Sequence, residues 1–112
     1  MPDSPREHIA RERIVAAAQA LLQGSLDSLR AAEQIAGAAA ELDPSHQDPD
    51  LTVFVAIHSE TNRYLVIDGD RGWHPHVRAA REAEYAVAEH RYRPDALASA
   101  QALLARFASR PA

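Results

Sequence analysis

Cysteine and lysine are both absent from the 112-residue chain. Without cysteine, the chain cannot form a disulfide, use a thiolate in catalysis, or build the cysteine-based zinc and iron-sulfur sites. Without lysine, all twelve basic side chains are arginines, and alanine makes up roughly a fifth of the residues. This combination is typical of the codon bias of a GC-rich bacterial genome. It therefore indicates an origin and gives no evidence for phosphate binding.

Aromatic residues and long apolar runs are also scarce. Aromatic residues make up 5% of the chain, and no stretch approaches the roughly 18 consecutive apolar residues of a membrane span. The N-terminal stretch MPDSPREHIARER lacks the apolar core of a signal peptide, so we expect a cytoplasmic protein that does not enter a membrane. Hydrophobic residues at 46% and charged residues at 25% are typical of a globular protein, and the length predicts a single domain over residues 1–112.

The net charge of −4 is spread unevenly. Acidic residues concentrate in residues 43–70, whereas most arginines follow residue 70. An acidic segment cannot displace the counterions of a nucleic acid, and the later arginines alternate with acids that can pair with them on a helix surface. We therefore expect no nucleic-acid partner.

The N-terminal part of the chain carries clear helix signals. Ser4-Pro5-Arg6-Glu7 combines a capping serine, a proline at the first helical position and a glutamate three residues after the cap. Gly24 can take the left-handed conformation that ends a helix. Between them, apolar residues recur at helical spacing, namely Ala10, Ile14, Ala17 and Leu21. The sequence predicts a helix from about Ser4 to Gly24.

A second helix is predicted from a cap at Ser25 to about Leu42. Its apolar stripe is rich in alanine, which allows a neighbouring helix to approach closely. Only Gly24 and Ser25 separate the two predicted helices, so we expect an antiparallel helical hairpin. The stripe consists of Leu29, Ala32, Ile35, Ala36, Ala39 and Leu42.

The middle of the chain has the pattern of a β-hairpin. Residues 43–50 contain two prolines and three aspartates, which predicts an exposed loop. The run LTVFVAIH then alternates in the manner of a strand, SETNR is the expected turn, and YLVI is the expected return strand. Both faces of this hairpin are apolar, so we expect helices on one face and other cover, such as a second subunit, on the other.

Two further helices are predicted after the hairpin. One begins at Trp73-His74-Pro75 and ends near Arg91, with its inner side formed by Ala79, Ala80, Ala83, Ala86 and Val87. The other begins at Pro94 and Asp95 and has the best amphipathic spacing in the chain. The predicted fold is therefore mainly α (α+β), with four helices in two antiparallel hairpins around a short central β-hairpin.

The segment IDGDRGWHPH, residues 67–76, has two interpretations. The favoured one is structural, with turns that end a strand, Trp73 filling the core and Pro75 starting a helix. The alternative is a divalent-metal site that activates a water, as in a metal-dependent hydrolase. Its spacing is atypical, because His74 and His76 are two residues apart while helical metal pairs favour four. The candidate ligands are His58, Glu60, Asp68, Asp70, His74 and His76.

Binding is a better-supported interpretation than catalysis. Ser59 next to His58 is not expected to act as a nucleophile and base, since adjacent residues of a strand point to opposite faces. Tyrosine and arginine side chains together are typical of interface centres, and an acidic loop offers a second surface of opposite charge. The candidate interaction residues are Tyr85, Arg91, Tyr92, Arg93, Asp48 and Asp50. We expect a protein partner or self-association.

Residues 48–61, DPDLTVFVAIHSET, contain the core D-P-D-[FL]…F-x-x-I-x-S-E-T. With helical segments on both sides, this core resembles a group of small bacterial proteins of unassigned function, and the resemblance implies no activity, cofactor or ligand. We therefore expect a small cytoplasmic, non-catalytic interaction domain, with no cofactor as the first expectation. Immunity and antidote proteins, which block a toxin by burying a charged surface, are the nearest analogy.

Overall fold

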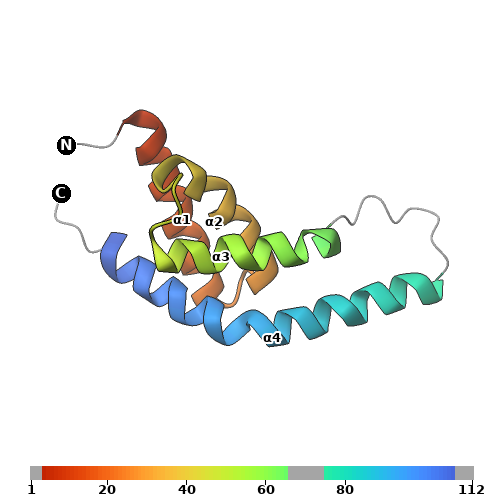
Figure 1. Cartoon of the computed structure of the whole chain (residues 1–112). Helices are drawn as coiled ribbons and strands as arrows, with labels where there is room; N and C mark the ends of the chain where they lie inside the picture. The colour runs from red at the N-terminus through yellow and green to blue at the C-terminus, as the bar shows by residue number, and fades with distance from the viewer. Residues whose placement is uncertain (1–3, 66–74, 108–112) are drawn as a thin grey trace.

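The computed structural model describes residues 4–65 and 75–107, and those residues are mainly helical (Figure 1). Four α-helices and one short 3₁₀ helix occur within these two ranges. The mainly helical class is confirmed, whereas the central β-hairpin is wrong, because no strand occurs among the described residues. The elements are α1 (Pro5–Gln23), α2 (Ser28–Leu42), α3 (Pro49–Thr61), η1 (Asn62–Leu65) and α4 (Pro75–Phe107).

Helix α1 forms as its sequence signals predict. The Ser4 hydroxyl accepts a hydrogen bond from the Glu7 N–H, and the Glu7 carboxylate accepts one from the Ser4 N–H. Gly24 ends the helix in the left-handed region at φ 83°. All four apolar residues of the predicted stripe are buried. The prediction for this helix is confirmed at both ends.

Helix α2 begins two residues later than predicted. Its cap is Asp27, whose carboxylate accepts from the Arg30 N–H at 2.8 Å, while the Ser25 hydroxyl donates to the Ala20 carbonyl of α1. Ser25 therefore belongs to the end of α1. The two helices pack against each other, with Ala31 and Ala32 fully buried. Alanine at these positions lets the helix axes approach closely, as the predicted hairpin requires.

Helix α3 stands where the sequence suggests a strand. Asp48 caps it by accepting from the N–H groups of Asp50 and Leu51, and Pro49 occupies its first turn. The buried residues recur every three to four positions, which is a helical spacing; they are Leu51, Phe54, Ile57 and Thr61. The predicted turn at residues 59–63 and the return strand at 64–67 are wrong as far as Leu65, because α3 continues through Thr61 into η1. Val66 and Ile67 lie outside the described residues.

The two helices predicted after residue 73 are one helix, α4, with Pro94 in its interior. Proline lacks the N–H that would bond to the carbonyl of His90, but both residues are exposed, so water can satisfy that carbonyl. On either side of Pro94, Ala88 and Ala96 are buried. Packing on both sides therefore outweighs the local break, and the second predicted hairpin does not exist.

All the described helices contribute to one buried cluster, whose largest members include Phe54, Ile14, Leu21 and Leu103. Helix α4 has 33 residues, and the molecule measures 53 × 24 × 23 Å. At a rise of about 1.5 Å per residue, α4 alone spans roughly the long dimension. The other helices cover only part of α4, and the candidate site lies beside the part that they leave uncovered (Figure 1). Within the described ranges, no helix has the length and apolar content needed to cross a membrane.

Candidate functional site

The N-terminal part of α4, residues 75–87, extends away from the buried cluster and is called the overhang here (Figure 1). Only Arg81 and Tyr85 within it are half-buried, and the other residues are exposed. Val77 is 42% exposed and Val87 is 68% exposed. The prediction that Ala79, Ala80, Ala83, Ala86 and Val87 form an inner, packed side is therefore wrong, because all five residues are exposed.

Polar contacts hold the overhang at its C-terminal end. The Tyr85 hydroxyl donates to the Asp27 carboxylate at 2.6 Å, and burial together with this bond raises the pKa of Tyr85. The Glu89 carboxylate accepts from the N–H groups of Ser28 and Leu29 at 2.7 and 3.3 Å. The Glu89 carboxylate of α4 thus satisfies two N-terminal donors of α2, where a negative charge is favoured.

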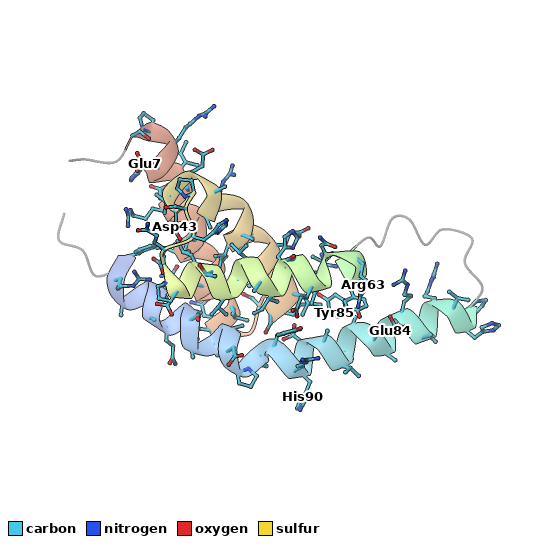
Figure 2. The ribbon with its side chains drawn as sticks, viewed as in Figure 1. Glu7, Asp43, Arg63, Glu84, Tyr85 and His90 are labelled. Atoms are coloured by element: carbon cyan, nitrogen blue, oxygen red, sulfur yellow. The ribbon has the colours of Figure 1, made fainter. Side chains whose placement is uncertain are left out.

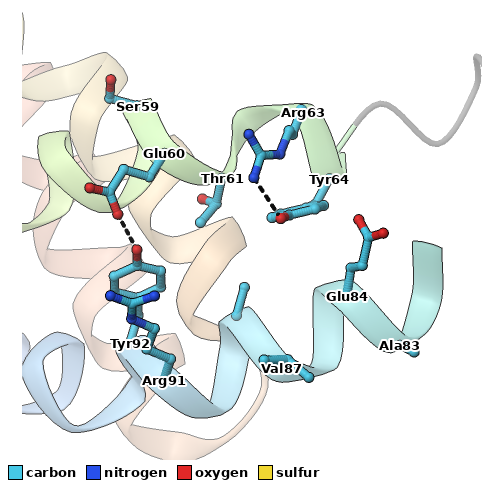
Figure 3. Close-up of a pocket in the computed structure, with 11 residues that line it drawn as sticks. Ser59, Glu60, Thr61, Arg63, Tyr64, Ala83, Glu84, Val87, Arg91 and Tyr92 are labelled. Atoms are coloured by element: carbon cyan, nitrogen blue, oxygen red, sulfur yellow. Dashed lines mark hydrogen bonds between the residues drawn. The ribbon is translucent and has the colours of Figure 1, made fainter. Parts of the chain in front are cut away.

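A groove of about 650 Å³ separates the overhang from α3 and η1 (Figure 3). We call it the α3–α4 groove. Helix α4 supplies the apolar part of its wall, while charged and tyrosine side chains come both from α4 and from α3 and η1. Its lining residues are Ser59, Glu60, Thr61, Arg63, Tyr64, Ala83, Glu84, Val87, Ala88, Arg91 and Tyr92.

Two tyrosine–arginine units lie in the α3–α4 groove. The Arg63 guanidinium donates to the Tyr64 hydroxyl at 2.8 Å and lies 4.8 Å from the centre of that ring. The Arg91 guanidinium lies 5.4 Å from the Tyr92 ring centre, and the Tyr92 hydroxyl donates to Glu60. This bond raises the pKa of Tyr92. Arginine held against tyrosine presents a flat surface with charge at its rim, a combination common in protein interfaces.

The predicted interaction residues occupy three separate places. Tyr92 and Arg91 line the groove, as does Glu60, which was considered as a metal ligand. Tyr85, labelled in Figure 2, contacts the residue that caps α2. Arg93 forms a 3.4 Å ion pair with Glu89, which also contacts the start of α2. Of the six candidate interaction residues, Arg91 and Tyr92 line the groove.

Asp48 and Asp50 lie at the opposite end of α4. The Arg106 guanidinium donates to both Asp48 oxygens at 2.9 and 3.0 Å and to Asp50 at 3.2 Å. Burial raises the pKa of Asp48, but the Arg106 and backbone hydrogen bonds outweigh it, so the net pKa is lowered. This carboxylate pair therefore joins the start of α3 to the end of α4.

A second hollow, of about 360 Å³, is lined by residues of α1, the loop before α3 and the end of α4. Its acids already serve the fold, because Asp43 accepts from the N–H groups of Gln47 and Asp48. Phe107, at its edge, lies 4.6 Å below the Arg11 guanidinium. This hollow lies at the end of the bundle and has less apolar surface than the α3–α4 groove.

The six candidate metal ligands are only partly described. His58 is half-buried on α3, and its Nδ1 is buried with no hydrogen-bond partner in the described structure. Glu60 binds Tyr92, and His76 is exposed at the start of α4. Asp68, Asp70 and His74 lie outside the described residues. Among residues 4–65 and 75–107, no three histidine or acidic side chains come together in a way that could hold a metal ion.

The sequence analysis missed Arg63, Tyr64 and the exposed position of Val87. Arg63 and Tyr64 were assigned to a β-hairpin, where nothing would bring them opposite α4. The missed signal is the content of residues 75–87, which contain two valines and no leucine, isoleucine or phenylalanine. A helix segment with so few large apolar side chains has little to bury against a core.

No family model matches the chain, and neither a curated protein nor a solved structure matches it. The functional argument therefore rests on the groove itself.

Proposed function

We propose that the protein is a small cytoplasmic, non-catalytic interaction protein that binds its partner in the α3–α4 groove. One observation carries this proposal. The overhang exposes Val77 and Val87 next to a groove that contains tyrosine and arginine side chains. Exposed apolar surface with a polar rim is typical of a docking site.

The groove offers both parts of such a site. Ala83, Val87 and Ala88 supply an apolar wall that loses contact with water when it is covered. Arg63 and Arg91 stand beside Glu60 and Glu84, so both charges occur at the rim. A mixed rim favours a partner that carries charges of both signs over a uniformly charged polymer. Blocking a toxin is one task that such a docking protein could perform, and it stays an analogy.

The proposal is tested by comparing partners of the wild-type chain with those of a groove variant. Val87→Glu places a carboxylate in the apolar wall, while Ile9→Glu makes the same change at a 50% exposed residue of α1 as a control. A partner that depends on the groove should be captured by wild type and Ile9→Glu, and lost with Val87→Glu. It should then bind as a purified protein about tenfold more weakly to Val87→Glu. Identical binding to all three chains would contradict the proposal.

A further inference from the structure

We infer that the partner in the α3–α4 groove is a second copy of this chain, whose overhang packs antiparallel to the first. This inference rests on the proposed function and names its partner. The two-fold axis passes near Glu82, midway between Val77 and Val87. Each copy then contributes the same surface to the contact, as two-fold symmetry requires.

The two valines of the overhang lie five residues on either side of Glu82. Val77, Ala80, Ala83 and Val87 recur at spacings of three, three and four residues, so they share one side of the helix. In an antiparallel pair centred near Glu82, Val77 of each copy meets Val87 of the other. Both exposed valines are thus covered by a single contact. The alanines between them allow the two helices to approach closely.

The charges of the overhang select the same arrangement. Arg81 and Glu84 lie on either side of a point half a residue from the midpoint of the valine pair, so each Arg81 comes close to Glu84 of the other copy. Within one chain these two side chains are 3.9 Å apart and about half exposed. Such an ion pair is weak, so replacing it with a pair between the two copies costs little free energy. A parallel pair would instead place Arg81 against Arg81. Antiparallel pairing is therefore the arrangement with complementary charge.

The groove adds a second wall to this contact. Glu84 faces the groove in the same view as Arg63 and Tyr64, which belong to η1 (Figure 3). The incoming overhang therefore lies against an aromatic side chain as well as against its twin helix. The contact is still short, since 13 helical residues span about 20 Å, so we expect a dissociation constant in the micromolar range.

The first test measures the molar mass of the full chain by sedimentation equilibrium from about 1 to about 500 μM. Wild type should shift from monomer to dimer over this range. Val87→Glu should weaken dimerisation at least about tenfold, because it brings carboxylates into an apolar contact, while Ile9→Glu should behave as wild type. Circular dichroism confirms that each variant is folded. A wild-type monomer throughout, or a Val87→Glu dimer of unchanged affinity, would overturn the inference.

The orientation is tested with single cysteines, which the cysteine-free chain allows. Ala83→Cys lies next to the axis and should form a disulfide-linked dimer under mild oxidation. Ala98→Cys is an exposed alanine 15 residues further along the same helix. In an antiparallel pair its two copies are about 50 Å apart, so it should stay monomeric on a denaturing gel. Efficient linkage through Ala98→Cys and none through Ala83→Cys would overturn the antiparallel arrangement.

Self-pairing and the proposed function can fail separately. If wild type is monomeric yet captures a different protein that Val87→Glu loses, the self-pairing is wrong and the docking function stands. If neither a second copy nor another protein depends on Val87, both are wrong.

Discussion

The two halves of α4 have similar alanine content but opposite surroundings. Residues 88–107 pack on the other helices and bury Ala96, Ala100 and Leu103, whereas residues 75–87 form the exposed overhang. The packed half contains Leu97, Leu103, Leu104 and Phe107, which fit against large apolar residues of α1 and α3. The overhang has only two valines. Large side chains at helical spacing therefore determine which part of α4 packs on the other helices and which part stays exposed.

The largest expected effect comes from shortening a core side chain in the packed half. Leu103 is fully buried, so Leu103→Ala should lower the free energy of unfolding by about 2–5 kcal/mol through lost contacts and a cavity. Val77→Ala in the overhang should change it by less than about 0.5 kcal/mol. Urea unfolding at low protein concentration measures both. Equal losses for the two variants would mean that the overhang is packed like the core.

The boundary between the halves is tested at Glu89. Glu89→Ala leaves the N–H groups of Ser28 and Leu29 without their charged acceptor. This change should lower the free energy of unfolding by about 2 kcal/mol. The control is Glu82→Ala, an exposed acid on the same helix, which should cost little. Chemical unfolding of both variants gives the comparison. A loss no larger than that of the control would show that water replaces the carboxylate at this helix start.

A smaller effect is expected at Tyr85. Tyr85→Phe removes the hydroxyl that donates to Asp27 and should lower the free energy of unfolding by about 1 kcal/mol, while Tyr64→Phe, at a half-buried residue of η1, should lower it by less than half of that. The pKa of Tyr85 is raised above its ordinary value of 10.0. Its contribution is therefore complete below pH 10 and is lost as the pH rises toward the higher folded pKa. The free energy of unfolding, measured from about pH 8 to about pH 11, should decline more steeply for wild type than for Tyr85→Phe.

Local signals predicted α1 well because they act within one helix. The capping contacts of Ser4 and Glu7 and the left-handed Gly24 need no distant partner, so the sequence contains all the information. The cap of α2 was misplaced because Ser25 and Asp27 are both capable caps. The choice depends on tertiary contacts, since the Asp27 carboxylate also accepts from Tyr85, 58 residues away.

The error at α3 has a different cause. Val53, Val55 and Ile57 alternate as in a strand, yet Leu51, Phe54 and Ile57 also fit a helix, and a short apolar run satisfies both spacings. Asp48-Pro49 repeats the pattern of Ser4-Pro5, a capping side chain followed by proline, and this signal could have decided the case. The groove could not be predicted, because it depends on where α3 and α4 meet.

Pro94 shows the limit of a local rule. Proline predicts a helix end because it removes a hydrogen bond, but the packing of residues on both sides keeps α4 continuous. The candidate interaction residues on this helix were therefore read as the ends of two helices. In the structure, Arg91 and Tyr92 lie in the middle of one helix, where they line the groove.

The smallest predicted effect concerns the far end of the packed half, where Arg106 binds Asp48. Arg106 is 46% exposed, so Arg106→Gln should lower the free energy of unfolding by less than about 1 kcal/mol at neutral pH. The control is Arg13→Gln, at an exposed position of α1. The pKa of Asp48 is lowered from 3.8, so its contribution is present above that value and is lost as the pH falls through the lower folded pKa. Lowering the pH should therefore reduce the difference in the free energy of unfolding between wild type and Arg106→Gln. Added salt should reduce the same difference at neutral pH. A difference that persists in strong acid would mean that Arg106 acts through its cation–π contact with Phe107, whose ring centre lies 5.4 Å from the guanidinium, and not through Asp48.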